Sequence, residues 1–342
     1  MGAFDPPSLP ARVLASPLLF VLRPVHALLA ALRPPPYTRA PAVPPVRVVC
    51  LADTHTLAVH DVPDGHLLVH AGDLANAGSV AEIQRAVDWL NSLPHAHKFV
   101  VAGNHDAACD TAAHSAIDWG AIHYLQNTSV TVAVQPAPDA RPRSFTVHGV
   151  PQVPQLVPDA NSAHHAFQYP PSARTDPWPH PIPPATDILV SHSPPLHHRD
   201  VFPHCVGCPF LLAAAWRTHP ALHVFGHAHA GRGVEPVYYD APQRALERMA
   251  ERRREPGYIW ERGKRSAVGW LVYGGWWRDI FSVWWAWRDA LAVVWGVGKA
   301  IVWTRIWGGQ RALGQEGWMV NAACMDPRGS GTLTGGATVI EL

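Results

Sequence analysis

Five short apolar runs, each ending in side chains that can bind metal, constrain the fold of this chain more than any other feature. They are Cys50-Leu-Ala-Asp-Thr-His55, Leu67-Leu-Val-His-Ala-Gly-Asp73, Phe99-Val-Val-Ala-Gly-Asn-His-Asp106, Ile188-Leu-Val-Ser-His192 and His223-Val-Phe-Gly-His-Ala-His229. A strand buried in a layered α/β protein has such a sequence, and ligands gather beyond the carboxyl ends of strands. The pattern therefore predicts an α/β fold with a dinuclear metal site where five strands end.

The segments between and after these runs predict the remaining elements. Residues 80–93 place Ile83, Val87 and Leu90 on one helical face, and Ser79 with Glu82 is a typical helix start. Residues 151–186 are rich in proline and lack periodicity, which indicates a loop over the site. The other patterns predict strands over 46–52, 67–71, 98–102, 144–149, 185–191 and 222–225, a helix over 209–217, and closing strands over 319–324 and 337–342.

Composition divides the chain into three parts. Residues 1–45 are rich in proline and have no acidic residue after Asp5, which predicts a flexible N-terminal tail. A partly helical tail and an organelle transit peptide both fit this segment. Residues 46–235 contain all five runs and form the predicted catalytic body, which residues 318–342 complete. Residues 236–317 are predicted to be a helical insertion rich in Arg and Trp.

The insertion contains most of the chain's 15 tryptophans. Its charged residues, which include Arg278, Asp279, Arg288, Asp289 and Lys299, exclude an easy bilayer span. A Trp-rich amphipathic helix with basic residues on its polar side is typical of peripheral membrane contact, here through residues 268–307. The same face is equally typical of a cap on the enzyme or of an oligomer interface.

Charge and cysteine content narrow the class of protein. The formal net charge is +1 and the pI is near 7.9, so we expect no binding to a nucleic-acid polymer. Five scattered cysteines argue against a disulfide framework and for a reducing compartment, so the expected location is intracellular, cytoplasmic or peripherally membrane-associated. Cys205 and Cys208 have zinc-knuckle spacing but no second pair to complete four ligands.

The ends of the five runs contain, in order along the chain, the motifs D-x-H (53–55), G-D (72–73), G-N-H-D (103–106), a lone His (192) and G-H-x-H (226–229). This sequence of blocks resembles the calcineurin-like metallophosphoesterases. The segments 93–106, 187–195, 206–208 and 222–229 are similar to the 239FB (MPPED) branch of that superfamily. The likeness covers residues 46–235 and the final strands, and it implies a four-layer α/β/β/α sandwich.

The resemblance also implies a role for each ligand. One metal ion would be bound by Asp53, His55 and His229 and the other by Asn104, His192 and His227, with Asp73 bridging the two. His105 would face the substrate phosphate as an acid or charge stabiliser. Protein phosphatases of the family have an Asp where this chain has Asn76, so the partner that orients His105 is an open question.

Two divalent cations can stabilise both the attacking and the leaving oxygen of a phosphoester. Imidazole and oxygen ligands without thiolate favour Mn, Fe, Zn or Ni. The expected function is therefore a dinuclear metal-dependent phosphoesterase. The resemblance favours a phosphodiesterase that acts on small, cyclic nucleotide-like substrates with a metal-bridging hydroxide as nucleophile.

The alternative function is a membrane-associated binding or scaffold protein with a vestigial metal site, against which the intact ligand set argues. Asp73 and Asn104 are also common loop-stabilising residues. Asp106 is expected to support the site structurally. His197, His198 and Arg199 are expected on the solvated surface, with contact to substrate phosphate as the other possibility.

Overall fold

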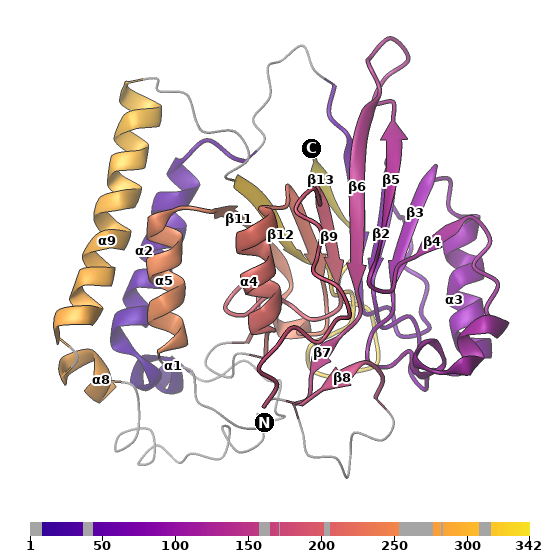
Figure 1. The fold of residues 1–342 in the computed structure, drawn as a ribbon, viewed down its shortest axis with the longest axis horizontal. Helices are drawn as coiled ribbons and strands as arrows, with labels where there is room; N and C mark the ends of the chain where they lie inside the picture. Colours follow the sequence, from indigo (N-terminus) through magenta and orange to yellow (C-terminus); the bar gives the residue numbers. More distant parts are fainter. Residues whose placement is uncertain are drawn as a thin grey trace.

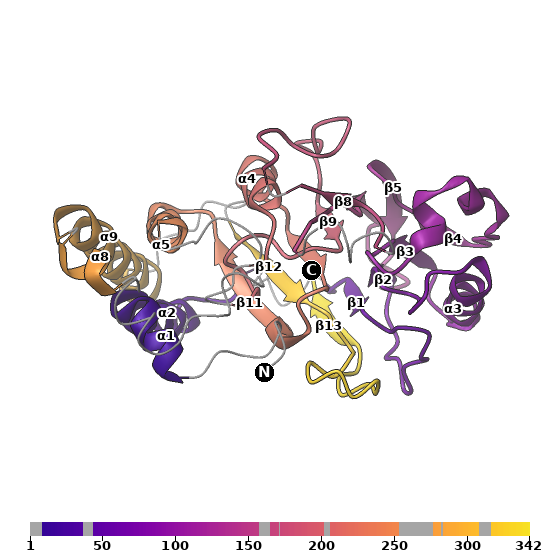
Figure 2. The same ribbon diagram turned by 90° about the horizontal axis from the view of Figure 1, so that it is seen from below.

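The computed structural model describes residues 9–36, 44–156, 165–170, 172–201, 206–252, 276–281, 283–307 and 316–342. Two β-sheets lie at its centre, and a group of helices lies to one side of them (Figures 1 and 2). A two-stranded pair, β7 (Val153–Pro154) and β8 (Gln168–Tyr169), falls in the proline-rich region. Part of that region, residues 157–164, lies outside the described chain.

The first sheet has five strands in the order β13-β1-β2-β3-β4. Its strands β1 to β4 are parallel and β13 pairs antiparallel with β1. The predicted strands at 46–52, 67–71 and 98–102 correspond to β1, β2 and β3, with small shifts at their ends. The bounds are β1 (Arg47–Leu51), β2 (Leu67–Ala71), β3 (His97–Val101), β4 (Ile122–Tyr124) and β13 (Thr338–Glu341).

The second sheet has six strands in the order β11-β12-β10-β9-β6-β5. The four inner strands are parallel and the two edge strands are antiparallel to their neighbours. The predicted second sheet is thus present, and the closing strand predicted at 319–324 corresponds to its inner strand β12, which begins and ends three residues earlier. The bounds are β5 (Thr128–Val134), β6 (Arg143–Val150), β9 (Ile188–Ser191), β10 (Leu222–Phe225), β11 (Gly233–Tyr238) and β12 (Glu316–Asn321).

The two sheets pack face to face and helices cover their outer faces. Fully buried residues such as Val48, Phe99 and Val224 form one core cluster between the sheets. Helix α3 (Val80–Ser92) packs Ile83 and its neighbours on the outer face of the first sheet, and α4 (Pro209–Thr218) packs on the outer face of the second. The layers are therefore α/β/β/α, and the predicted fold class is confirmed.

The start of α3 shows how closely local sequence sets these elements. Ser79 accepts a hydrogen bond from the backbone N–H of Glu82, and the Glu82 side chain accepts one from the backbone N–H of Ser79. This reciprocal capping box satisfies backbone donors that the first helical turn leaves unpaired. The predicted helix over 80–93 is confirmed with its start at Val80.

The remaining helices form a separate group, which we call the helical unit. It consists of α1 (Leu9–Ala15), α2 (Pro17–Leu32), α5 (Ala241–Glu251), α8 (Trp276–Phe281), α9 (Val283–Ile301) and the π-helical turn Val302–Ile306. Figures 1 and 2 show α2, α5 and α9 side by side at one end of the molecule. The helical insertion predicted at 236–317 supplies most of it, and residues 253–275 of that insertion lie outside the described chain.

Part of the segment expected to be a flexible tail packs into this unit. Leu19 and Leu22 of α2 are buried against Met249 and Ala250 of α5 and Ala290 of α9. Arg33 also forms an ion pair with Asp240 at the start of α5, with an N–O distance of 3.0 Å. Residues 9–33 are therefore helical and packed rather than a loose tail, because the insertion offers them an apolar partner.

Two buried carboxylates fix α8 and α9 to the unit. Asp279 accepts a hydrogen bond of 2.6 Å from the Ser16 hydroxyl, at the N-terminus of α2. Asp289 is 1% exposed and accepts hydrogen bonds from both Arg248 and Arg252 at 2.9 Å. The acidic side chains of these helices thus face inward.

Candidate metal centre

The predicted ligands lie in the loops that follow the strands, where the backbone turns sharply. Asp53, His55, Asp73 and His227 all have positive φ angles, of 53°, 45°, 56° and 64°. Non-glycine residues adopt this left-handed conformation at a cost, and such residues cluster at functional sites. His227 and His229 are two residues apart, and on an extended strand their side chains would point to opposite faces. The left-handed turn at His227 allows both side chains to reach the site.

Glycines let the loops approach one another closely. A side chain at Gly103 would collide with the carboxylate of Asp73, and one at Gly226 would collide with that of Asp53. The loops are also hydrogen bonded to one another, since the Asp53 N–H donates to the carbonyl of Gly72 at 2.9 Å. The glycines in the G-D, G-N-H and G-H-x-H blocks are therefore needed for the ligands to converge.

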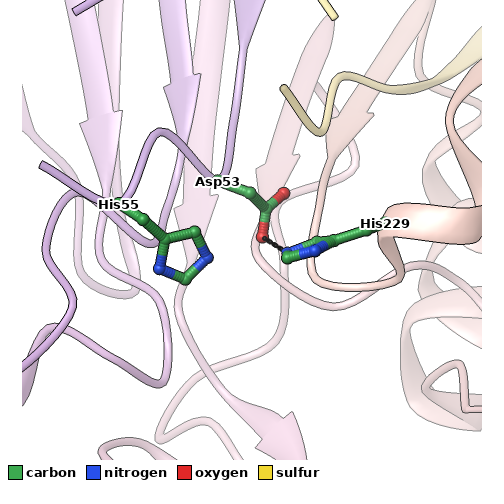
Figure 3. Close-up of side chains that lie close together, drawn as sticks. All are labelled: Asp53, His55 and His229. Atoms are coloured by element: carbon green, nitrogen blue, oxygen red, sulfur yellow. Dashed lines mark ion pairs between the residues drawn. The ribbon is translucent and has the colours of Figure 1, made fainter. Parts of the chain in front are cut away.

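Asp53, His55 and His229 form one group of ligand atoms. Their donor atoms lie within 4.8 Å of one another. Figure 3 shows the Asp53 carboxylate pointing at the His229 ring, with His55 facing them from the other side. The distance from Asp53 Oδ1 to His229 Nε2 is 3.3 Å. This is the first of the two ligand sets predicted from the sequence.

Asp73 lies between this group and the second one. Its Oδ2 atom is 3.6 Å from His55 Nε2, and its Oδ1 atom is 3.3 Å from His192 Nε2. Its donor atoms belong both to a group with His55 and His105 and to a group with Asp53 and His192. The two carboxylate oxygens thus face opposite ligand sets, which is the geometry a bridging ligand requires.

Asn104, His192 and His227 complete the second set. His192 Nε2 is 3.0 Å from Asn104 Oδ1, and the rings of His192 and His227 have centroids 5.0 Å apart. The other ring nitrogen of His192 is 2.8 Å from the carbonyl of Ala71. A carbonyl partner on one ring nitrogen orients the other toward a metal, as is common for metal-bound histidines.

The residues fit a divalent cation. Both ring nitrogens of His55 and the Nε2 atom of His227 are buried and have no hydrogen-bond partner in the part of the chain that the structure describes. Buried polar atoms without partners are costly and need an explanation. Cations bound at one ring nitrogen of His55 and at Nε2 of His227 would supply it, and the mixture of imidazole and oxygen donors suits Mn, Fe, Zn or Ni.

A family model described as calcineurin-like phosphoesterase matches residues 46–231 of this chain. The chain belongs to this family. The matched range contains the whole ligand set, from Asp53 to His229.

Named relatives place the chain more closely within the family. It is 32% identical over 232 residues to human "Metallophosphoesterase domain-containing protein 1", across 59% of this chain and 64% of that protein. It is 32% identical over 200 residues to a UPF0046 protein of Caenorhabditis elegans, across 56% of this chain and 66% of that protein. The resemblance to the MPPED branch is confirmed.

Another relative is much longer than this chain. Over 215 residues the chain is 40% identical to "Probable rhamnogalacturonate lyase C" of Emericella nidulans, which is 60% of this chain but 19% of that protein. A solved structure, of TT1561 from Thermus thermophilus, aligns with 63% of this chain and 99% of that chain at 13% identity and a TM-score of 0.37. At that TM-score the structural match carries no argument.

Burial and neighbouring charges set the protonation of the candidate metal centre. Burial raises the pKa of Asp73, but the neighbouring His192 outweighs it, so the pKa lies well below its ordinary value. Burial lowers the pKa of His192, whereas Asp73 and Asp53 raise it, with a net result of about 9. Burial and the charge on His192 lower the pKa of His227 to about 3. A metal ion bound at His192 would compete with a proton for the ring nitrogen.

Asp106, the last residue of the G-N-H-D block, supports the loops. It is fully buried and accepts hydrogen bonds from the backbone N–H groups of Leu74, Ala75 and Gly103. Burial and the nearby Asp73 raise its pKa to about 7. The carboxyl group joins the loop after β2 to the loop after β3, as expected for a structural role.

His105 stands beside the ligands with its own partner. Its Nδ1 atom is 2.9 Å from the backbone carbonyl of Asn76, and its backbone N–H donates to Asp73 Oδ1 at 2.9 Å. Its ring meets that of His55 edge-on, with centroids 4.9 Å apart. The backbone carbonyl of Asn76 is therefore the partner that orients the His105 ring, which answers the question left open by the sequence.

His165 is a site residue that sequence reasoning missed. Its Nδ1 atom is 2.8 Å from Asn104 Nδ2, and its ring meets the His105 ring edge-on with centroids 4.9 Å apart. It comes from the proline-rich segment, where no motif or periodicity marks it. Accepting a hydrogen bond from Nδ2 directs the Oδ1 atom of Asn104 toward the ligand cluster.

His197, His198 and Arg199 do not join the site, because their side chains pair with Glu251 and Glu235. His198 is 4% exposed, and its ring nitrogens lie 2.5 Å from Glu235 Oε1 and 3.0 Å from Glu247 Oε1. Burial lowers the pKa of His198, but the two carboxylates raise it to about 10. The expectation of a solvated surface was wrong for His198, because α5 covers this loop and supplies Glu247.

Proposed function

We propose that this chain, a member of the calcineurin-like phosphoesterase family, binds two divalent metal ions and hydrolyses small phosphodiesters of the cyclic nucleotide type. The observation that carries the proposal is the position of Asp73. Each of its carboxylate oxygens faces a different ligand group, at 3.6 Å from His55 Nε2 and 3.3 Å from His192 Nε2.

The first ion would be held by Asp53, His55 and His229, and the second by Asn104, His192 and His227, with Asp73 shared between them. Bound cations supply Lewis-acid polarisation of the phosphate and lower the pKa of coordinated water. The chain itself keeps the oxygen ligands ionised at neutral pH, because Asp53 and Asp73 both have lowered pKa values. Manganese is the first metal to test among Mn, Fe, Zn and Ni.

His105 is the proton donor in this proposal. The Asn76 carbonyl accepts the Nδ1 proton, which leaves Nε2 as the nitrogen that faces substrate. A positioned acid of this kind contributes about 10²–10⁴-fold to the rate. Contacts with His55 and His165 on either side restrict the His105 ring, so the Nε2 proton keeps one direction relative to the ligand groups.

The proposed substrate class rests on the family resemblance. Hydrolysis of bis(p-nitrophenyl) phosphate is measured with the chelated protein and after manganese is added, beside the monoester p-nitrophenyl phosphate. The proposal predicts manganese-dependent turnover of the diester, faster than that of the monoester. Faster turnover of the monoester would contradict the diester preference. No turnover of either ester under saturating manganese would favour the vestigial-site alternative.

The cysteines fit an intracellular site of action, which we also propose. Cys50, Cys109, Cys208 and Cys324 are free and buried among the described residues. Cys208 serves structure, since it caps the N-terminus of α4. Cys205 lies outside the described chain.

A further inference from the structure

Exposed apolar side chains are concentrated on the helical unit. Among the described residues, fourteen large apolar side chains are exposed, and all but Leu57 belong to the helical unit or directly follow it. A soluble surface usually scatters such side chains singly, and a concentration of them marks an interaction site. The catalytic body therefore leaves this apolar surface of the helical unit uncovered, and the surface is a candidate binding site for another partner.

On α9 these side chains form one stripe. The positions follow helical spacing, so they lie on one side of the helix, opposite the buried Val293 and Val297 that pack inward. A helix of this length extends about 28 Å. The stripe and its continuation are Trp287, Leu291, Val294, Trp295, Val302, Trp303, Ile306 and Trp307, which are 39–76% exposed.

Helix α2 adds a second stripe beside the first. It packs against α9, and its exposed residues Val21, Leu28 and Leu32 recur at helical spacing. Leu28 is 65% exposed. The apolar surface therefore extends over two neighbouring helices.

The charges of this surface have one sign. Residues 9–36 contain no acidic residue, and residues 276–307 contain only Asp279 and Asp289. Both are buried, at 7% and 1% exposure, and both are hydrogen bonded inside the unit. Arg288 and Lys299 are exposed on α9. The outer face is thus apolar and basic, with its acids turned inward.

We propose that this face of α2 and α9 docks on a bilayer surface that contains anionic phospholipid. Tryptophan is suited to the boundary between headgroups and acyl chains, and basic residues beside an apolar stripe bind acidic lipids. None of the described helices is long and apolar enough to cross a membrane. The helices lie on the bilayer rather than within it, and the buried acids hold α9 to the protein while its outer side contacts lipid.

Flotation of the full-length protein with vesicles tests the proposal. Phosphatidylcholine vesicles are compared with vesicles that also contain phosphatidylserine. The wild-type protein is expected to float with the serine-containing vesicles. The double variant Leu291→Glu/Trp295→Glu should lose at least about tenfold in affinity, because two exposed apolar side chains that would enter the lipid become charged. Leu57→Glu, the same change on the catalytic body, is the matched control and should bind like wild type.

The charge contribution is tested separately. Lys299→Glu should weaken binding to the serine-containing vesicles about fivefold or more, because one basic residue near such a surface is worth about that factor. Its residual binding to phosphatidylcholine should be unchanged. Equal loss on both vesicle types would overturn the role of anionic lipid.

Tryptophan fluorescence of the wild-type protein gives a readout that needs no variant. Quenching by brominated phosphatidylcholine is expected, since the exposed tryptophans would enter the acyl boundary. No quenching and no flotation would overturn the proposal. A dimer in free solution that Leu291→Glu/Trp295→Glu converts to monomer, together with no vesicle binding, would assign the surface to a second copy of the chain instead.

Discussion

The catalytic body buries polar side chains, whereas the helical unit exposes apolar ones. In the body, Asp53 and His192 are 0% exposed and Asp73 is 2% exposed. In the helical unit, Trp295 is 76% exposed and Leu28 is 65% exposed. Both arrangements oppose the usual distribution of residues, and each is costly for an isolated protein. Each region therefore needs a partner from outside the chain. We infer that the catalytic body binds metal ions and that the helical unit binds lipid.

The largest expected effect comes from removing the shared carboxylate. Asp73→Ala should lower phosphodiester turnover by at least about 10³-fold, because both ligand groups lose a member and transition-state stabilisation with it. Bound manganese, measured by elemental analysis, should fall as well. Vesicle binding should be unchanged, which separates the two regions.

Asp88→Ala, on the exposed face of α3, is the control for this change. It removes a carboxylate of the same size and should keep both activity and metal content. Full metal content in Asp73→Ala would show that this carboxylate is not a shared ligand.

The next effect concerns the proton donor. His105→Ala should lower kcat by about 10²-fold or more while the metal content stays at the wild-type level. Asn76→Ala should remain within about twofold of wild type, because the contact to His105 comes from the backbone carbonyl. A large loss in Asn76→Ala would show that the side chain, not the carbonyl, orients the histidine.

His165 should have an intermediate effect through Asn104. His165→Ala should weaken manganese binding about 10–100-fold, the range for residues that orient a metal ligand. His165→Gln offers an acceptor for Asn104 Nδ2 and should recover part of the affinity. Titration calorimetry measures both. Equal affinity in His165→Ala and wild type would remove the positioning role.

The last effect is one on stability; it concerns a contact between the two regions and depends on pH. The folded pKa of His198, about 10, lies above its ordinary value of 6.5, so its ion pairs contribute full stability below about pH 6.5. That contribution is lost as the pH rises toward 10. His198→Gln should therefore lower the free energy of unfolding by about 2–4 kcal/mol near pH 6 and by much less near pH 10.

Denaturant unfolding at both pH values checks this difference. His60→Gln, at an exposed loop histidine, is the control and should match wild type at each pH. A His198→Gln deficit that does not shrink with pH would mean that packing, not charge, links the loop to α5.

The sequence was most informative where a segment carries its own signal. The strands β1, β2, β3, β9 and β10 were predictable because both of their faces are buried, which produces unbroken apolar runs. The start of α3 was predictable because Ser79 and Glu82 cap it locally. The convergence of the seven predicted ligands followed from the carboxyl ends of these strands, which belong to two sheets that pack face to face.

Contacts between distant segments were not predictable. The Asn76 carbonyl leaves no mark in the sequence, because every residue has one. His165 lies 61 positions from Asn104 in a segment without periodicity. The burial of His198 depends on Glu247, 49 positions away, and the packing of α2 depends on α5 and α9. These features arise from tertiary structure that no local pattern encodes.

The bridging position of Asp73 is tested most directly by a crystal structure of the manganese-loaded protein, with anomalous scattering to locate the ions. We predict two peaks, with the Asp73 carboxylate bound to both at about 2.0–2.2 Å. A single peak, or two peaks of which only one contacts Asp73, would contradict the account.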